Sequence, residues 1–319
     1  MFKVLNKKLR TIILSGSSTE NGLKIGLTLR PDIQKLIHRE RKLLDATKAH
    51  NPNLISYLRR KLTKLFPESI SELRGVASGA KVDFLDLLLE NCPELLHKED
   101  GCTSATVKNK KDFFIIHNED EVRVRPASSM ALARYSGRSY DRSAFLYGGE
   151  LAGNAFGWAE DWFYCVNYLP VRKPDLRGAP RYFVARRVLE EKNITGALKF
   201  LRSVDDASGF HYLMGNTDGE AVSVEKRVKD ISIRTAIPAY FHSNHYIHPK
   251  FNNSETVRTK SSMIRLSIAK KEVGRNTNPK EALTIWRGEL RRPFDKDDYD
   301  SKTFATVIAD LKQKIISIY

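Results

Sequence analysis

The sequence predicts an α+β protein whose helices and strands form layers around one shared core. Three observations predict this class. Up to residue 97 the apolar residues recur mostly at helical spacing, and from residue 103 runs of β-branched and aromatic residues predict strands. The chain then ends in two apolar runs that resemble a hairpin. Helices followed by a strand-rich block and a closing hairpin are typical of α+β layers packed as one unit.

The first third of the chain is expected to be mostly helical. Residues 11–30 are predicted to begin it with two short strands, TIILS and LKIGLTL, separated by the turn-rich loop GSSTENG. Apolar stripes predict helices over 32–48 and 54–65. Residues 70–96 predict two more helices with a break at Gly79, and Asp83 is expected to cap the second one.

The rest of the chain is expected to alternate strands with a few helices. TSATV and DFFIIHN (112–118) predict two strands joined by the polar turn KNKK, and KTFATVIADLKQKIISIY predicts a closing hairpin. Residues 182–202 predict a helix pair broken at 193–195, with Thr195 as N-cap. Helices are also expected at 257–272 and 279–289. Further strands are expected at 144–147, 155–158, 162–168, 210–214, 220–225, 229–235 and 239–243.

Composition narrows the class of protein. The net charge of +16 on 319 residues raises the question of nucleic-acid binding. The basic residues are scattered, however, and no long basic run is interleaved with aromatic residues. We therefore expect no specific nucleic-acid partner, and instead a solvated basic surface or attraction to anionic substrates.

Hydropathy and cysteine content indicate a cytoplasmic protein without a membrane span. No segment approaches the roughly 20 apolar residues that cross a bilayer, and the short apolar run near the N-terminus is less than the roughly 7–15 residues of a signal peptide. Three cysteines are too few for a disulfide framework and suit a reducing compartment.

Cys102, in KEDGCTSATV, is the residue that raises the question of chemistry. It could be a buried core residue, a metal ligand, a disulfide partner or a nucleophile. If the chain is cut between Gly101 and Cys102, the new α-amino group, with a pKa of roughly 7.7–8.0, lies on the nucleophile's own residue. That amine could act as general base without a histidine. Gly101 would present an unhindered carbonyl to the sulfur.

Residues elsewhere in the chain could serve this cysteine. Thr103 or Ser104 could orient the thiol or the amine, and Asn244 follows a predicted strand, where its side-chain amide could donate to an oxyanion. HNED, which contains Asn118, Glu119 and Asp120, ends the strand that a hairpin returns beside Cys102. Asp120 could therefore reach the new amine or a cationic part of a substrate.

At this point the sequence resembles the acyl-coenzyme A:6-aminopenicillanic acid acyltransferase family of N-terminal-nucleophile hydrolases. The similar pieces occur in order along residues 11–319. They are ELRGVASGAKVDFLDLLLENCPEL, DGCTSATV, HNED, ARRVLEE, MGNTDGEAVSVEK, SNHYIHP and FATVIADLKQKIISIY. The sequence departs from the family at Glu119, where many members carry an aromatic residue. Near the last hairpin it offers Lys302 and no arginine to pair with Asp120.

The resemblance implies a four-layer αββα sandwich. It also implies a precursor that cuts itself between Gly101 and Cys102. Residues 1–101 would be a mostly helical segment packed on the same core as the nucleophile-bearing segment 102–319, within one structural domain. By the same resemblance Cys102 would be the nucleophile, Asn244 the oxyanion donor and Asp120 a positioning charge. The substrate would be a small amide or an acyl thioester such as an acyl-coenzyme A.

Other candidates and other functions stay open at this stage. His242, His245 and His248 are spaced as H-x2-H-x2-H, but no neighbouring ligand completes a zinc set, so we expect no metal and no cofactor. Glu225 ends a predicted strand and is expected to support the site or a hydrogen-bond network.

The alternative functions are a non-enzymatic basic binding protein on the same scaffold and a conventional cysteine hydrolase that uses a histidine such as His245. Cys92 and Cys165 are expected in the core.

Overall fold

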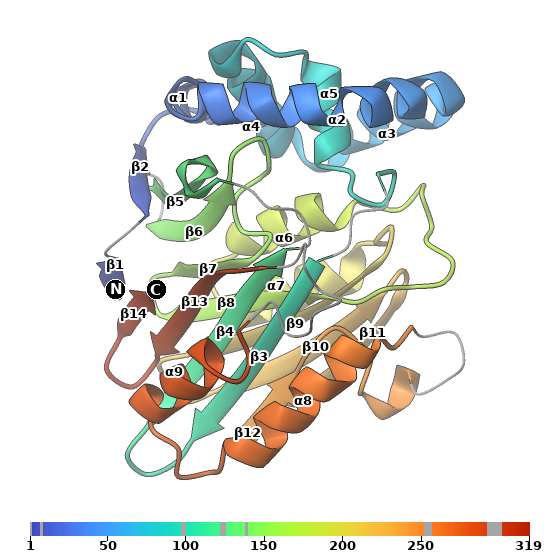
Figure 1. Ribbon diagram of the computed structural model, residues 1–319. Coiled ribbons are helices and arrows are strands. Elements are labelled where there is room, and N and C mark those ends of the chain that lie inside the picture. Colours follow the sequence, from blue (N-terminus) through green and yellow to red (C-terminus); the bar gives the residue numbers. More distant parts are fainter. Residues whose placement is uncertain are drawn as a thin grey trace.

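Two β-sheets lie face to face, and helices cover both outer faces (Figure 1). The computed structural model describes residues 2–6, 9–96, 100–121, 126–137, 140–251, 257–291 and 302–319. One apolar cluster joins the eight-stranded sheet to the helices within residues 18–90 and 181–203, a second lies between the sheets, and a third joins the six-stranded sheet to the helices within residues 260–287. This arrangement confirms the predicted α+β class and the four-layer αββα sandwich.

The helices agree with most of the predicted ranges. Asp83 caps α5, as predicted, and its side chain accepts hydrogen bonds from the backbone N–H groups of Leu85 and Asp86. The helices of the described residues are α1 (Ser18–Thr28), α2 (Arg30–His50), α3 (Pro52–Leu65), α4 (Pro67–Ala80), α5 (Phe84–Glu90), α6 (Arg181–Leu189), α7 (Ile194–Ser203), α8 (Lys260–Glu272) and α9 (Pro279–Arg287).

Three local predictions in the helical regions were wrong. The segment LKIGLTL belongs to α1 and is not a strand, because Ser17 and Glu20 form a capping box that starts a helix. The first break falls at Lys81, which takes a left-handed conformation, and not at Gly79, which is helical. Asn193, and not Thr195, caps α7 by accepting the backbone N–H of Gly196.

Two glycine pairs explain why α1 is a helix despite its strand-like sequence. Gly22 and Gly26 of α1 face Gly75 and Gly79 of α4 at backbone contact. A Cβ on Gly22 would lie 1.9 Å from the carbonyl oxygen of Glu72, and one on Gly75 would lie 2.1 Å from that of Thr19. The absence of side chains lets the two helix backbones touch. This tertiary contact outweighs the low helix propensity of glycine.

The six-stranded sheet holds the strand of Cys102 between two neighbours. β3 pairs antiparallel with β4 on one side and with β12 on the other. The predicted hairpins of β3 with β4 and of β13 with β14 are confirmed. In order across the sheet the strands are β1 (Lys3–Asn6), β14 (Ile315–Ile318), β13 (Lys302–Asp310), β4 (Phe113–Glu121), β3 (Asp100–Lys108) and β12 (Ala239–His242).

The eight-stranded sheet faces β3 and β4 across the inter-sheet core. β2 pairs in parallel with β5, a strand that the sequence patterns did not predict. In order the strands are β11 (Asp230–Thr235), β10 (Ala221–Arg227), β9 (Gly209–Asn216), β8 (Trp162–Tyr168), β7 (Phe156–Ala159), β6 (Arg142–Tyr147), β5 (Met130–Tyr135) and β2 (Arg10–Leu14). Within the described residues no helix has the length and hydrophobicity to cross a bilayer.

The glycine contact between α1 and α4 predicts a large effect of a small substitution. Gly26→Ala would place its Cβ 2.3 Å from the carbonyl oxygen of Val76, so the two helices would have to separate. We expect the free energy of unfolding to fall by about 2 kcal/mol, within the range of overpacking effects. Urea unfolding measures this. Gly274→Ala is the control, because a Cβ there meets nothing within 4 Å. Equal stability of the two variants would contradict the prediction.

Candidate active site at Cys102

Cys102 lies near the start of β3, and its side chain is 2% exposed. Successive side chains of a strand point to opposite faces of the sheet. Ser104 therefore shares the inter-sheet face with the thiol, and its hydroxyl contacts Asn167 of β8. Thr103 points to the other face, toward Arg265 of α8. In β4, Glu119 is the direct neighbour of Cys102, and Asp120 is the neighbour of Gly101.

The backbone of Cys102 is held by Asn244 and Arg265. Its N–H donates to Asn244 Oδ1 at 2.8 Å, and its carbonyl oxygen accepts from Arg265 Nη1. Arg265 also donates to Asn244 Oδ1 and to Thr103 Oγ1, both at 2.7 Å. One buried guanidinium thus binds the cysteine, its neighbour and the asparagine together. Asn244 Nδ2 in turn donates to the carbonyl oxygen of Tyr168 at 3.0 Å.

Glu225 holds the loop that carries Asn244. Its Oε1 lies 2.9 Å from His242 Nε2 and accepts the backbone N–H of Ile247 at 2.6 Å. Burial opposes the charge of Glu225, but the hydrogen bond and charge of His242 lower its pKa below the ordinary value. The carboxylate therefore folds residues 242–248 into a turn, and this turn brings Asn244 beside Cys102. The structure thus places Glu225 in a hydrogen-bond network that supports the loop.

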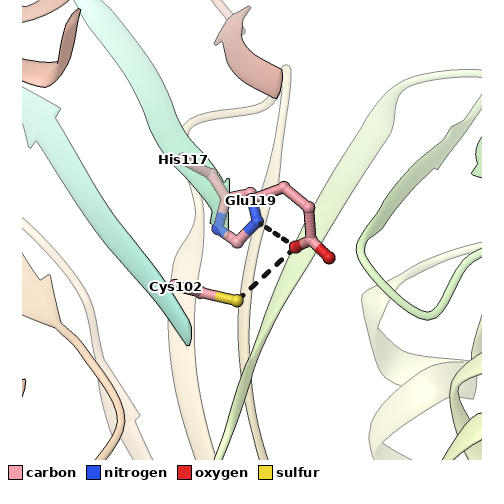
Figure 2. Close-up of side chains that lie close together, drawn as sticks. All are labelled: Cys102, His117 and Glu119. Atoms are coloured by element: carbon pink, nitrogen blue, oxygen red, sulfur yellow. Dashed lines mark hydrogen bonds and ion pairs between the residues drawn. The ribbon is translucent and has the colours of Figure 1, made fainter. Parts of the chain in front are cut away.

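The thiol of Cys102 faces a carboxylate. Its Sγ lies 3.5 Å from Glu119 Oε2, and His117 Nε2 lies 3.2 Å from the same oxygen (Figure 2). Tyr147 donates its hydroxyl to Glu119 Oε1 at 3.0 Å. Burial lowers the pKa of His117 to about 3, so this imidazole stays neutral at neutral pH. The arrangement offers the thiol a proton acceptor whose two oxygens are already fixed by neighbours.

Cys102, His117 and Glu119 are also the residue types that bind soft metals. Their sulfur, nitrogen and oxygen atoms lie within 4.8 Å of one another, and all three side chains are buried. Thiolate, imidazole and carboxylate together could serve as three zinc ligands. In this structure the same atoms contact one another directly as hydrogen-bonding partners (Figure 2).

Asn118 and Asp120 lie on the face of the sheet that is opposite to the thiol. Asn118 Nδ2 donates to the carbonyl oxygens of Trp286 and Leu290, at the end of α9. Asp120 Oδ1 accepts the hydroxyl of Thr303 in β13 at 2.5 Å. The side chain of Lys302, the cation expected beside Asp120, lies outside the described residues. The role of Asp120 as a positioning charge for the new amine or for a cationic part of a substrate stays a prediction.

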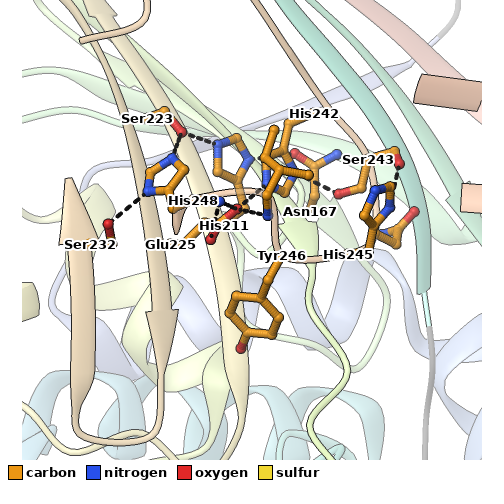
Figure 3. A network of polar contacts seen from close by, with 12 residues as sticks. Asn167, His211, Ser223, Glu225, Ser232, His242, Ser243, His245, Tyr246 and His248 are labelled. Carbon is orange, nitrogen blue, oxygen red and sulfur yellow. Dashed lines mark hydrogen bonds and ion pairs between the residues drawn. The ribbon is translucent and has the colours of Figure 1, made fainter. Parts of the chain in front are cut away.

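The three histidines of the H-x2-H-x2-H segment turn to different partners (Figure 3). His242 bonds Glu225, His245 Nδ1 lies 2.7 Å from Ser262 Oγ, and His248 Nε2 lies 2.9 Å from Ser223 Oγ. His245 thus joins its loop to α8. Among the described residues the three do not form a set that could hold a metal ion.

The other two cysteines are core residues, as predicted. Cys92 is 2% exposed, and burial followed by the charge of Glu94 raises the pKa of its thiol well above the ordinary value. Burial raises the pKa of Cys165 to about 12. Both thiols are therefore protonated at neutral pH, and a protonated thiol is a poor nucleophile.

Sequence reasoning missed Arg265 and His117. In α8 the buried residues are Ser262, Arg265, Leu266 and Ala269, which is the stripe of a helix face. An arginine in such a stripe must find buried acceptors. Its place in the stripe is therefore the sequence signal that could have identified Arg265. His117 alternates with Glu119 along β4, so strand periodicity alone places both on the face of the thiol.

Comparison with known proteins identifies the family. The model of the family described as acyl-coenzyme A:6-aminopenicillanic acid acyl-transferase matches residues 107–319, two thirds of the chain. The chain belongs to this family. The match begins at Val107, just after Cys102, and covers the segments that carry His117, Glu119, Asn244 and Arg265.

Relatives of this acyltransferase-family chain include characterised hydrolases. The beta-alanyl-dopamine/carcinine hydrolase of Drosophila melanogaster is 22% identical over 298 residues, which are 80% of this chain and 76% of the relative. Among solved structures, penicillin V acylase from Agrobacterium tumefaciens has a TM-score of 0.45 at 13% identity, covering 66% of this chain and 80% of that one. A mutant of conjugated bile acid hydrolase from Clostridium perfringens has a TM-score of 0.42 at 12% identity, covering 68% and 88%. The family match and the Drosophila sequence relative support an enzyme that hydrolyses amides or transfers acyl groups.

The buried histidines predict a loss of stability in mild acid. Burial, with smaller effects of His242 and Arg258, lowers the pKa of His245 to about 4, from an ordinary value of 6.5. Between these pH values the unfolded chain binds a proton that the folded chain does not, so stability falls as the pH falls through this window. Urea unfolding at pH 7 and pH 5 measures the fall. It should be smaller in His245→Asn, whereas the control His38→Asn, exposed on α2, should retain the wild-type fall. An equal fall in both variants would contradict this account.

Proposed function

We propose that this chain is the precursor of an N-terminal-cysteine amide hydrolase or N-acyltransferase, activated by cleavage between Gly101 and Cys102. One observation carries the proposal. Both reactive atoms of Cys102 already have polar partners, since its N–H donates to Asn244 Oδ1 and its Sγ faces Glu119. A cysteine that only filled the core would need neither contact.

Cleavage would give the thiol its own base. The freed α-amine of Cys102, with an ordinary pKa of roughly 7.7–8.0, would accept the thiol proton as sulfur attacks the substrate carbonyl. The resulting oxyanion would accept from Asn244, whose Nδ2 carries a second N–H beside the one that donates to Tyr168. Collapse of the tetrahedral intermediate would return the proton to the leaving amine. The acyl group would then remain on sulfur until water or an acceptor amine removes it.

The cut segment 1–101 is expected to stay bound to segment 102–319. Its helices share the apolar cluster that covers the eight-stranded sheet. Two buried ion pairs also join the segments: Glu72 Oε2 lies 2.9 Å from Arg186 Nη2, and Glu94 Oε1 lies 3.4 Å from Arg181 Nη1. Separation would expose both the apolar surface and these charges, so we propose a two-chain enzyme with one common core.

The surroundings of the thiol favour a substrate that carries an amine. A narrow cavity at Cys102 is lined by the carboxylates of Glu119 and Glu150 and by the rings of Tyr147, Tyr168 and Tyr182. Carboxylates and aromatic faces attract cations, even in a chain with a net charge of +16. The Drosophila relative is named for beta-alanyl-dopamine and carcinine. We propose small amides of this kind as substrates, and we propose the cytoplasm as the compartment because the cysteines are few and unpaired.

The alternative functions have less support from the geometry. A conventional cysteine hydrolase would need an imidazole bonded to the sulfur. Here Glu119 Oε2 contacts both Cys102 Sγ and His117 Nε2, and His245 bonds Ser262. A purely structural binding protein would not need the contacts at Cys102.

Cleavage of the purified chain tests the proposal. Wild-type protein should give fragments of about 11 kDa and about 25 kDa, in proportion to their shares of the 36.4 kDa chain. The larger fragment should begin Cys-Thr-Ser by N-terminal sequencing. Cys102→Ala should stay intact, whereas Cys92→Ala, the control at a buried core thiol, should be cut like the wild type. A wild-type chain that stays intact after long incubation would overturn the proposal.

A further inference from the structure

The first cut poses a chemical problem that the mature enzyme does not have. Before cleavage the nitrogen of Cys102 is an amide, which cannot accept the thiol proton. Some other group must accept the thiol proton during the single self-cleavage of each chain. We propose that Glu119 is this group, a catalytic base for self-cleavage that acts before the α-amine exists. The inference rests on the proposed function, because it assumes that the bond between Gly101 and Cys102 is cut.

Glu119 has the position that the step requires. Its Oε2 lies 3.5 Å from Cys102 Sγ, within reach of an S–H hydrogen bond, and register places the two residues directly opposite each other in β3 and β4. The side chain of Glu119 is 7% exposed, so little water competes for the proton. His117 is the imidazole of this cluster, and it contacts Oε2 of Glu119 (Figure 2).

The hydrogen bonds behind His117 decide whether Glu119 can be a carboxylate. Ser104 Oγ lies 3.0 Å from His117 Nδ1 and 2.8 Å from Asn167 Oδ1, and His211 Nδ1 lies 2.9 Å from that same oxygen. Asn167 Nδ2 is buried with no partner in the described part of the chain. Turning this amide about its last bond directs the two N–H groups of Nδ2 at Ser104 and His211, so that one unpaired carbonyl oxygen replaces two buried unpaired N–H groups.

The turned amide fixes the tautomer of His117. Ser104 accepts from Asn167 and is free to donate its own proton to His117 Nδ1. The imidazole then carries its hydrogen on Nε2 and donates it to Glu119 Oε2. Burial lowers the pKa of His117 to about 3, so the ring remains this neutral donor. With Tyr147 donating to the other oxygen, Glu119 is held as a carboxylate with Oε2 toward the sulfur.

The same carboxylate can complete the proton transfer. Glu119 removes the proton from Sγ as sulfur attacks the Gly101 carbonyl carbon, forming a C–S bond and an oxyanion. The C–N bond then breaks, and the protonated Glu119 gives its proton to the departing nitrogen of Cys102. The product is a thioester between Gly101 and the cysteine sulfur, with a free α-amine. Water hydrolyses the thioester to the Gly101 carboxylate and the free thiol. No redox partner or cofactor is needed.

Arg265 and Asn244 already hold the backbone next to the bond that is attacked. Arg265 binds the carbonyl oxygen of Cys102, and Asn244 Oδ1 accepts the N–H of the bond that breaks. These two contacts hold the peptide while Glu119 acts on the sulfur from the inter-sheet face.

The test compares self-cleavage of full-length wild type and Glu119→Gln by denaturing gel and intact mass at pH 7. Gln keeps the shape of the side chain but cannot accept the proton, so we expect cleavage to slow by about 10²-fold or more. The defect should shrink toward pH 9, where the thiol ionises without help, since an ordinary thiol pKa is about 8.5. A merely structural defect would not be repaired by alkali. Glu220→Gln, in the turn between β9 and β10, is the charge control and should cleave like the wild type.

The outcomes separate this inference from the proposed function. Wild-type cleavage that Cys102→Ala abolishes, together with a Glu119→Gln rate equal to wild type at pH 7, would overturn the role of Glu119 alone. Restoration of the Glu119→Gln rate by hydroxylamine, which cleaves thioesters, would also overturn it, because the block would then follow the acyl shift. If Glu119→Gln does not fold, as judged by its thermal transition, Glu119→Asp replaces it. That variant withdraws the carboxylate from the sulfur and should also cleave more slowly at pH 7, while an unchanged rate would contradict the inference.

Discussion

The site depends on the hydrogen bonds that the buried guanidinium of Arg265 donates. It donates to the carbonyl oxygen of Cys102, to Thr103 Oγ1 and to Asn244 Oδ1, so it joins β3 to the loop after β12. A buried guanidinium is costly unless its N–H groups find acceptors, and here those acceptors are the groups that fix Cys102. One side chain of α8 therefore joins Cys102 to Asn244, and Glu225 holds the loop that carries Asn244.

The two faces of β3 and β4 carry different kinds of side chains. On the face toward α8 and α9, Thr103, Asn118 and Asp120 make contacts that hold the strands. On the inter-sheet face, Cys102, Glu119 and His117 meet in a buried cluster, and Ser104 and Asn167 extend it toward His211. Because strand side chains alternate, the thiol lies on one face of the sheet, and the side chains of Thr103, Asn118 and Asp120 lie on the other. This separation lets a buried sulfur face a carboxylate while its backbone stays rigid.

Much of this arrangement could be predicted from the sequence, because strand and helix periodicities are local. The layers and the hairpin of Cys102 follow from these periodicities. Asn244 was singled out by its place after a predicted strand and by the resemblance to the family, and the structure places its side chain against the N–H of Cys102. The second half of α1 was mistaken for a strand. The capping box of Ser17 and Glu20 is a local signal for the helix, but the packing of its glycines on Gly75 and Gly79, about fifty residues away, is not local. Arg265 and the pairing of Glu119 with the thiol depend on how α8 packs and on strand register, which one sequence does not display. The chemistry at Cys102 is a proposal because it depends on cleavage of the peptide bond between Gly101 and Cys102.

The central claim is that residue 102 becomes an N-terminal cysteine, so a reagent specific for that structure tests it most directly. A 2-cyanobenzothiazole probe forms a stable ring only where a free amine and a thiol belong to the same N-terminal cysteine. The account predicts one label per chain of native wild-type protein, on the larger fragment, at Cys102, and none on Cys92 or Cys165. A native protein that hydrolyses or transfers acyl groups and yet carries no such label would contradict the account.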